Sequence, residues 1–73
     1  MISKRKATAI GRLLISSAEI DSKRGENEKL QDILGKSLYY KKGNKWYYDI
    51  ERMNKMTMLE LDRYAVKIEK TLR

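Results

Sequence analysis

The stretch that decides the fold spans residues 37–50 and reads SLYYKKGNKWYYDI. It holds the single tryptophan and four of the five tyrosines of the chain. Two runs of strand-favouring aromatic residues flank Gly43 and Asn44, and a two-residue loop that begins with glycine is typical of a type II′ turn. We therefore predict an antiparallel β-hairpin that closes at these two residues.

The turn fixes the register of the predicted strands. The expected pairs are Lys42 with Lys45, Lys41 with Trp46, Tyr40 with Tyr47, Tyr39 with Tyr48, and Leu38 with Asp49. Side chains alternate between the two faces of a hairpin. One face should therefore carry Tyr39, Lys41, Trp46, Tyr48 and Ile50, and the other Leu38, Tyr40, Lys42, Lys45, Tyr47 and Asp49.

The face with Trp46 and Ile50 has the larger apolar surface, so we expect it to pack on helices, with Trp46 organising the core. The opposite face then exposes two tyrosines and two lysines to solvent. A one-residue change in the turn would exchange the two faces, so the assignment depends on the turn.

The length and composition of the chain favour one small domain over residues 1–73, with a limited core. The absence of cysteine and histidine removes disulfides, thiolate and imidazole nucleophiles, and most metal ligands. We expect no cofactor and no metal. The chain has no apolar run long enough for a signal sequence or a membrane span, so we expect a cytoplasmic protein without a membrane partner.

The chain is strongly basic, with 17 Lys and Arg against 10 Asp and Glu and a formal charge of +7. The charge is uneven, at +4 for residues 1–24, −2 for 25–35, +4 for 36–55 and +1 for 56–73. A surface of this kind attracts polyanions or an acidic protein. Positive charge is concentrated at the N-terminus and around the hairpin.

Residues 1–6 contain the run Lys4, Arg5 and Lys6, which we interpret as a flexible basic arm or a frayed first helical turn. The spacing of the following apolar residues predicts an amphipathic helix from Ser3 to Asp21, with an alternative break near Ser16. Its apolar positions are Ala7, Ile10, Leu13, Leu14 and Ala18. Gly25 is a natural C′ residue for the end of this element.

A second, short helix should run from Glu26 to Gly35 with one apolar face. It carries Glu26, Glu28 and Asp32 with only Lys29 in support. Phosphates would repel such a face, so we exclude this helix as a reading helix in a DNA groove.

The last helix has the clearest local signal in the sequence. Thr57 and Glu60 form a capping box, and Met56 with Leu61 has the spacing of a hydrophobic staple, so the helix should begin at Met58. The residues that share its apolar face are Met58, Leu61, Ala65, Ile68 and Leu72. This stripe is expected in the core, with a homodimer through the C-terminal helix as the alternative. Residues 51–55 should form a connector with a helical turn.

The predicted order is therefore helix, helix, hairpin, helix (ααββα), an α+β fold. From about Ile10 to Met56 this order resembles the small winged-helix domains of the MerR-like and phage excisionase type, with residues 41–46 in the place of the wing. The resemblance implies wing contacts to a DNA backbone. The acidic second helix departs from the recognition helix of that family.

We expect no enzymatic activity, because the sequence has no phosphate loop, nucleophile motif or paired carboxylates at a site. Binding is the function class that remains, and we expect the hairpin to be the binding surface. The residues expected to contact nucleic acid, with DNA ahead of RNA, are Tyr40, Lys41, Lys42, Lys45, Tyr47, Lys4, Arg5 and Lys6. The composition resembles that of phage or mobile-element proteins, which fits a regulatory or accessory role.

Two other interpretations of the hairpin remain open. The lysines can serve only to prevent association of exposed strands, with the tyrosines packed in a core. Alternatively, the exposed tyrosines can anchor an inhibitor or adaptor on an acidic protein, beside an adaptable patch of Met53, Met56 and Met58.

Overall fold

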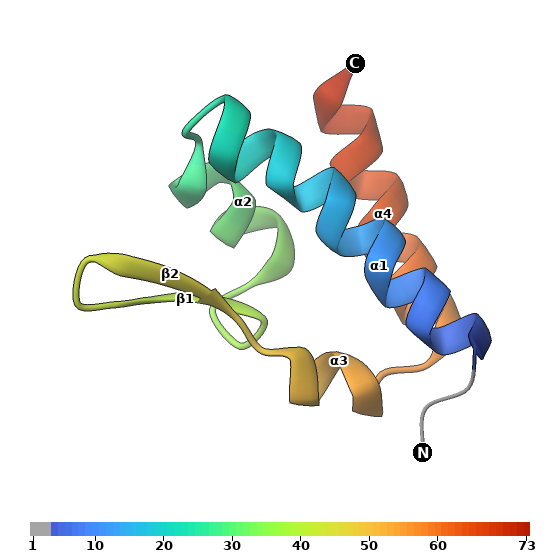
Figure 1. Cartoon of the computed structure of the whole chain (residues 1–73). Coiled ribbons are helices and arrows are strands. Elements are labelled where there is room, and N and C mark those ends of the chain that lie inside the picture. Colours follow the sequence, from blue (N-terminus) through green and yellow to red (C-terminus); the bar gives the residue numbers. More distant parts are fainter. Residues whose placement is uncertain (1–3) are drawn as a thin grey trace.

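The computed structural model describes residues 4–73 and has the predicted order of elements (Figure 1). Helix α1 (Lys4–Ala18) continues into the π-helical turn η1 (Glu19–Lys23), and α2 (Asn27–Leu34) follows. Strands β1 (Tyr39–Lys42) and β2 (Lys45–Tyr48) form the hairpin, and α3 (Ile50–Lys55) and α4 (Met58–Leu72) complete the chain. The α+β class and the ααββα layout are confirmed, with α3 as the helical connector. No helix within residues 4–73 is long and apolar enough to cross a membrane.

Helices α1 and α4 pack along each other and form the larger part of the body (Figure 1). Their shared core contains Ile10, Leu13, Leu61, Ala65 and Ile68, each no more than 6% exposed. Leu61, Ala65 and Ile68 of the α4 stripe are therefore buried inside the chain, as the core interpretation predicted. Three other predicted positions are wrong: Met58 is 38% exposed, and Ala7 and Ala18 face solvent.

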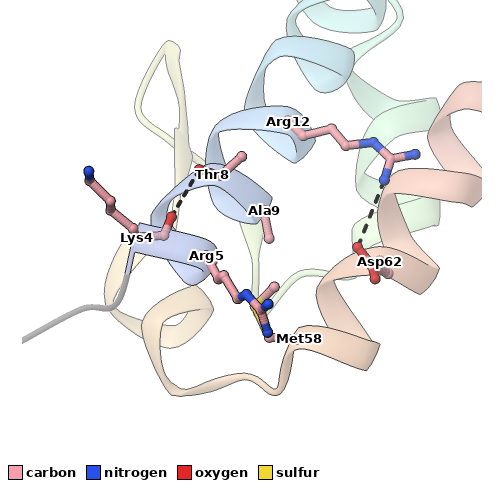
Figure 2. Close-up of a pocket in the computed structure, with 7 residues that line it drawn as sticks. All are labelled: Lys4, Arg5, Thr8, Ala9, Arg12, Met58 and Asp62. Atoms are coloured by element: carbon pink, nitrogen blue, oxygen red, sulfur yellow. Dashed lines mark hydrogen bonds and ion pairs between the residues drawn. The ribbon is translucent and has the colours of Figure 1, made fainter.

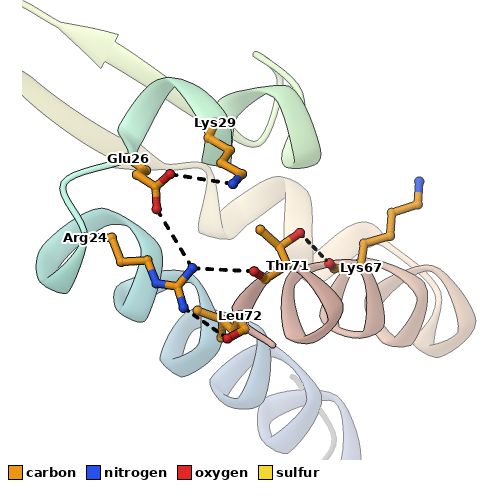
Figure 3. Close-up of polar contacts among 6 residues, drawn as sticks. All are labelled: Arg24, Glu26, Lys29, Lys67, Thr71 and Leu72. Carbon is orange, nitrogen blue, oxygen red and sulfur yellow. Dashed lines mark hydrogen bonds and ion pairs between the residues drawn. The ribbon is translucent and has the colours of Figure 1, made fainter.

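Polar contacts join Arg12 of α1, and Arg24 beyond η1, to the C-terminal part of α4. Arg12 donates two hydrogen bonds to the Glu69 carboxylate, at 2.6 and 3.1 Å, and these hold the pKa of Glu69 below its ordinary value. Arg24 donates to the carbonyl oxygens of Thr71 and Leu72 at 3.5 and 3.0 Å (Figure 3). These carbonyls have no partner within their own helix, and a cation is favourable at that end.

The first helix differs from its predicted form at both ends. Lys4, Arg5 and Lys6 are the first turn of α1 rather than a flexible arm, and residues 1–3 of the predicted arm lie outside the described residues. No break occurs at Ser16, because Ser16 and Ser17 are buried within the helix. Beyond Ala18 the chain widens into η1, and Gly25 then adopts the predicted left-handed conformation, with φ of 66°.

The hairpin has the predicted register at every strand pair, and Asp49 N–H donates to the Leu38 carbonyl at 2.8 Å. Gly43 has a φ of 64°, and no non-glycine residue within 4–73 has a positive φ. A positive φ at only the first of the two loop residues is what a type II′ turn requires.

The inner face of the hairpin is organised by Tyr39 rather than by Trp46. Tyr39 is fully buried, whereas Trp46 is only partly buried and stacks on Tyr39, with ring centroids 5.0 Å apart. Two residues are on the wrong side in the predicted assignment. Ile50 is 41% exposed because the strand ends at Tyr48 and the next residue, Asp49, caps α3. Leu38 is 3% exposed because it precedes the strand, in the turn after Gly35, where alternation does not apply.

A carboxylate of η1 connects the hairpin to the helices. The hydroxyls of Tyr48 and Tyr39 both donate to Asp21, at 2.5 and 3.3 Å, and Asn27 donates to the Tyr39 hydroxyl at 2.8 Å. Gln31 donates to the Tyr39 carbonyl at 3.2 Å. Burial, and secondarily the hydrogen bond to Asp21, raises the pKa of Tyr48, and burial raises that of Tyr39.

This network predicts a loss of stability at alkaline pH. Tyrosines in the unfolded chain ionise near pH 10, whereas the raised pKa values of Tyr39 and Tyr48 favour their protonated forms in the folded chain. The two protonated tyrosines therefore contribute fully to the free energy of unfolding below about pH 10. Above that pH their contribution falls, by up to about 1.4 kcal/mol per pH unit for each tyrosine. Urea unfolding at about pH 8 and pH 11 measures this loss. Tyr48→Phe should lose less stability over this range than the wild type, and an equal loss in both would contradict the assignment.

Candidate nucleic-acid interface

The tip of the hairpin extends away from the helical body (Figure 1). We define the hairpin tip as five residues, namely Tyr40, Lys41, Lys42, Lys45 and Tyr47. The structure brings them together on two paired strands of four residues each. All five are exposed, and they include the four residues predicted for the outer face around the turn.

The two outer tyrosines form a preformed aromatic pair. Their rings stack with centroids 5.8 Å apart and planes 27° apart. Tyr40 is 37% exposed and Tyr47 is 40% exposed, so neither belongs to the core. Together with Lys42 and Gly43 they line an open cavity of about 600 Å³. The cross-strand pairing therefore supports an aromatic surface in contact with solvent.

The three lysines of the tip have no ion-pair partner among residues 4–73. Lys42 lies directly opposite Lys45 in the register. Like charges in this arrangement destabilise a hairpin, so the pair has a cost in the isolated protein. An anion bound at the tip would remove that repulsion.

Lys4, Arg5 and Lys6 do not join this surface. They lie at the start of α1, at the opposite end of the molecule from the hairpin tip (Figure 1). Lys4 and Arg5 line a separate cavity of about 520 Å³ between α1 and the start of α4, together with Thr8, Ala9, Arg12, Met58 and Asp62 (Figure 2). The predicted set of contact residues is thus divided between two ends of a molecule about 31 Å long.

The methionine patch of the protein-docking alternative is largely absent. Met53 is fully buried and Met56 is 9% exposed, which leaves Met58 as the exposed member of the group. Both buried methionines belong to the hydrophobic core. Their side chains therefore stabilise the fold and do not form a surface beside the hairpin.

Sequence reasoning missed the space between the hairpin and α2. Two adjoining cavities of about 530 and 400 Å³ share Trp46, Lys41 and Glu28. The signal for such a space was the pairing of Lys41 with Trp46 on the inner face. We had no reason to expect a cavity there, because the whole inner face was predicted to pack on helices.

The chain matches no protein-family model, no curated protein and no solved structure in the comparisons made with each. The winged-helix resemblance therefore rests on the order of elements alone. The function must be inferred from the geometry of the chain itself.

Proposed function

We propose that this protein binds nucleic acid through the hairpin tip and acts without catalysis, in a regulatory or accessory role. One observation carries the proposal. The tip presents an exposed, stacked tyrosine pair beside three lysines that have no ion-pair partner among the described residues. DNA is the expected partner ahead of RNA, and a cytoplasmic location fits this role.

The lysines supply the electrostatic part of the binding. Each lysine that neutralises a phosphate releases condensed counterions, so the affinity falls as salt rises. The net charge of +7 adds a general attraction that speeds association. The projection of the tip from the body leaves it accessible to an extended polyanion.

The tyrosines supply a contact that charge alone does not. Lysines alone are sufficient to prevent association of exposed strands, and the stacked pair adds an exposed aromatic surface beside them. Stacking of a base on an aromatic side chain contributes about 1–3 kcal/mol. The exposed faces of Tyr40 and Tyr47 are suited to such stacking.

We expect the double variant Tyr40→Ala and Tyr47→Ala to bind a labelled oligonucleotide about tenfold more weakly, because it loses the stacking surface but keeps every charge. Fluorescence anisotropy at low salt, with DNA and RNA of the same sequence, measures the loss. The matched control is Tyr40→Phe with Tyr47→Phe, which keeps both rings and should keep the affinity. Unchanged binding by the alanine variant would contradict the stacking role.

A further inference from the structure

A groove runs between the inner face of the hairpin and α2. We define the Trp46 groove as the larger of the two cavities there, about 530 Å³, lined by Glu28, Gln31, Asp32, Lys36, Tyr40, Lys41 and Trp46. Its walls come from α2, the following turn and both strands. Tyr40 also lines the cavity at the hairpin tip, so the two spaces adjoin at this residue.

Trp46 gives the groove a rigid planar wall. The indole stacks on Tyr39 with the ring planes 13° apart, and Tyr39 is fully buried and hydrogen-bonded to the helices. The indole is only partly buried, and the remainder of it lines the groove. Proteins hold unpaired bases on aromatic surfaces of this kind.

The two carboxylates of the groove have no side-chain partner within the described chain. Glu28 and Asp32 are one helical turn apart on α2, and neither carboxylate has a hydrogen bond or an ion pair among residues 4–73. Like charges at this spacing destabilise a helix slightly. Ionised carboxylates only accept hydrogen bonds, so the pair is suited to a ligand that carries N–H donors.

The groove also contains two lysines that are not paired with its carboxylates. Lys36 and Lys41 line it, yet neither forms an ion pair with its two carboxylates. Acceptors and cations are therefore both available to one ligand. A nucleotide combines a planar ring, N–H donors on the ring edge and a phosphate.

We propose that the Trp46 groove binds one unpaired guanine of a single-stranded nucleic acid whose backbone lies on the hairpin tip. Guanine presents two adjacent N–H donors on its Watson–Crick edge, and a single carboxylate such as that of Glu28 can accept both. In a duplex that edge is paired and both ring faces are stacked, so the groove selects single strands. This inference rests on the proposed function and adds a substrate class and a base to it.

The test uses labelled oligothymidines of about ten nucleotides that carry one central guanine, inosine or thymine. Inosine lacks the N2 amino donor of guanine. In anisotropy titrations we expect the guanine probe to bind about tenfold more tightly than the thymine probe, with inosine losing most of that gain. Fluorescence of Trp46, the only tryptophan, should be quenched by the guanine probe.

The decisive variant is Glu28→Gln, and its expected effect has two parts. It should lower the preference for guanine, because a carboxylate acceptor is lost, while affinity for the thymine probe stays equal or rises, because a negative charge is removed. Glu51→Gln makes the same charge change in α3, outside the groove, and should keep the guanine preference. Both residues are exposed and neither has a partner among residues 4–73, so both variants should fold.

Each other outcome overturns the inference in a recognisable way. Equal wild-type affinity for the guanine and thymine probes, or tighter binding of a duplex, contradicts the groove while leaving the hairpin tip in place. If Glu28→Gln strengthens binding of all probes equally, its carboxylate only repels phosphates. If no probe binds at all, the proposed function fails together with the inference.

Discussion

Replacing Tyr39 with alanine is expected to cause the largest loss of stability of any single substitution considered for this chain. Tyr39 is fully buried, and its hydroxyl links Asp21 to Asn27. Removing a buried aromatic side chain costs about 3–5 kcal/mol. A domain of this size has a total free energy of unfolding of only about 4–11 kcal/mol. The variant should therefore lose a large share of the wild-type free energy of unfolding.

Urea unfolding followed by far-ultraviolet circular dichroism measures this loss. The matched control is Tyr40→Ala, the neighbouring tyrosine, which is exposed and should cost less than about 1 kcal/mol. Trp46→Ala should cost less than Tyr39→Ala, since the indole is only partly buried. A larger loss of stability in Trp46→Ala than in Tyr39→Ala would support Trp46 as the organising residue and contradict the described core.

The largest effect on binding is expected from reversing the charge of the hairpin tip. The triple variant Lys41→Glu, Lys42→Glu and Lys45→Glu should lose at least about 100-fold in affinity for nucleic acid, because three phosphate contacts become repulsive. Its fold should remain, since all three lysines are exposed and have no ion pair among residues 4–73. Anisotropy at low salt measures the affinity, and circular dichroism checks the fold.

A second triple variant separates the position of the charges from their number. Lys55→Glu, Lys67→Glu and Lys70→Glu make the same change in net charge on α3 and α4, at exposed positions. We expect this variant to lose much less affinity. Equal losses in the two variants would mean that net charge, and not the hairpin tip, determines binding.

Features set by neighbouring residues were predictable from the sequence. The Gly43-Asn44 loop alone determines the register, and the observed strand pairs follow it. The Thr57 and Glu60 capping box, with donor and acceptor three residues apart, fixes the first turn of α4, and both of its hydrogen bonds are present. These signals need no knowledge of how the helices pack.

Features set by packing were not predictable in the same way. The widening of α1 into η1 has no local signal, yet it places Asp21 at the hydroxyls of Tyr39 and Tyr48. Binary alternation could not decide which aromatic residue is buried deepest, because Tyr39 and Trp46 share one face.

The candidate site also has parts that could be predicted from neighbouring residues and parts that depend on packing. The hairpin tip follows from the register, so its five residues could be grouped from sequence. The distance between the tip and the basic turn of residues 4–6 depends on the packing of α1, so their separation could not be foreseen. The Trp46 groove also needed the position of α2 beside the hairpin.

The most direct test of the central claim is a titration of the wild-type protein into a labelled single-stranded oligonucleotide at rising salt. We predict binding at low salt that weakens on a log–log plot with a slope of about −2, as expected for three lysines on single-stranded phosphates. The absence of binding at low salt, or an affinity that does not change with salt, would contradict nucleic-acid binding by the hairpin tip.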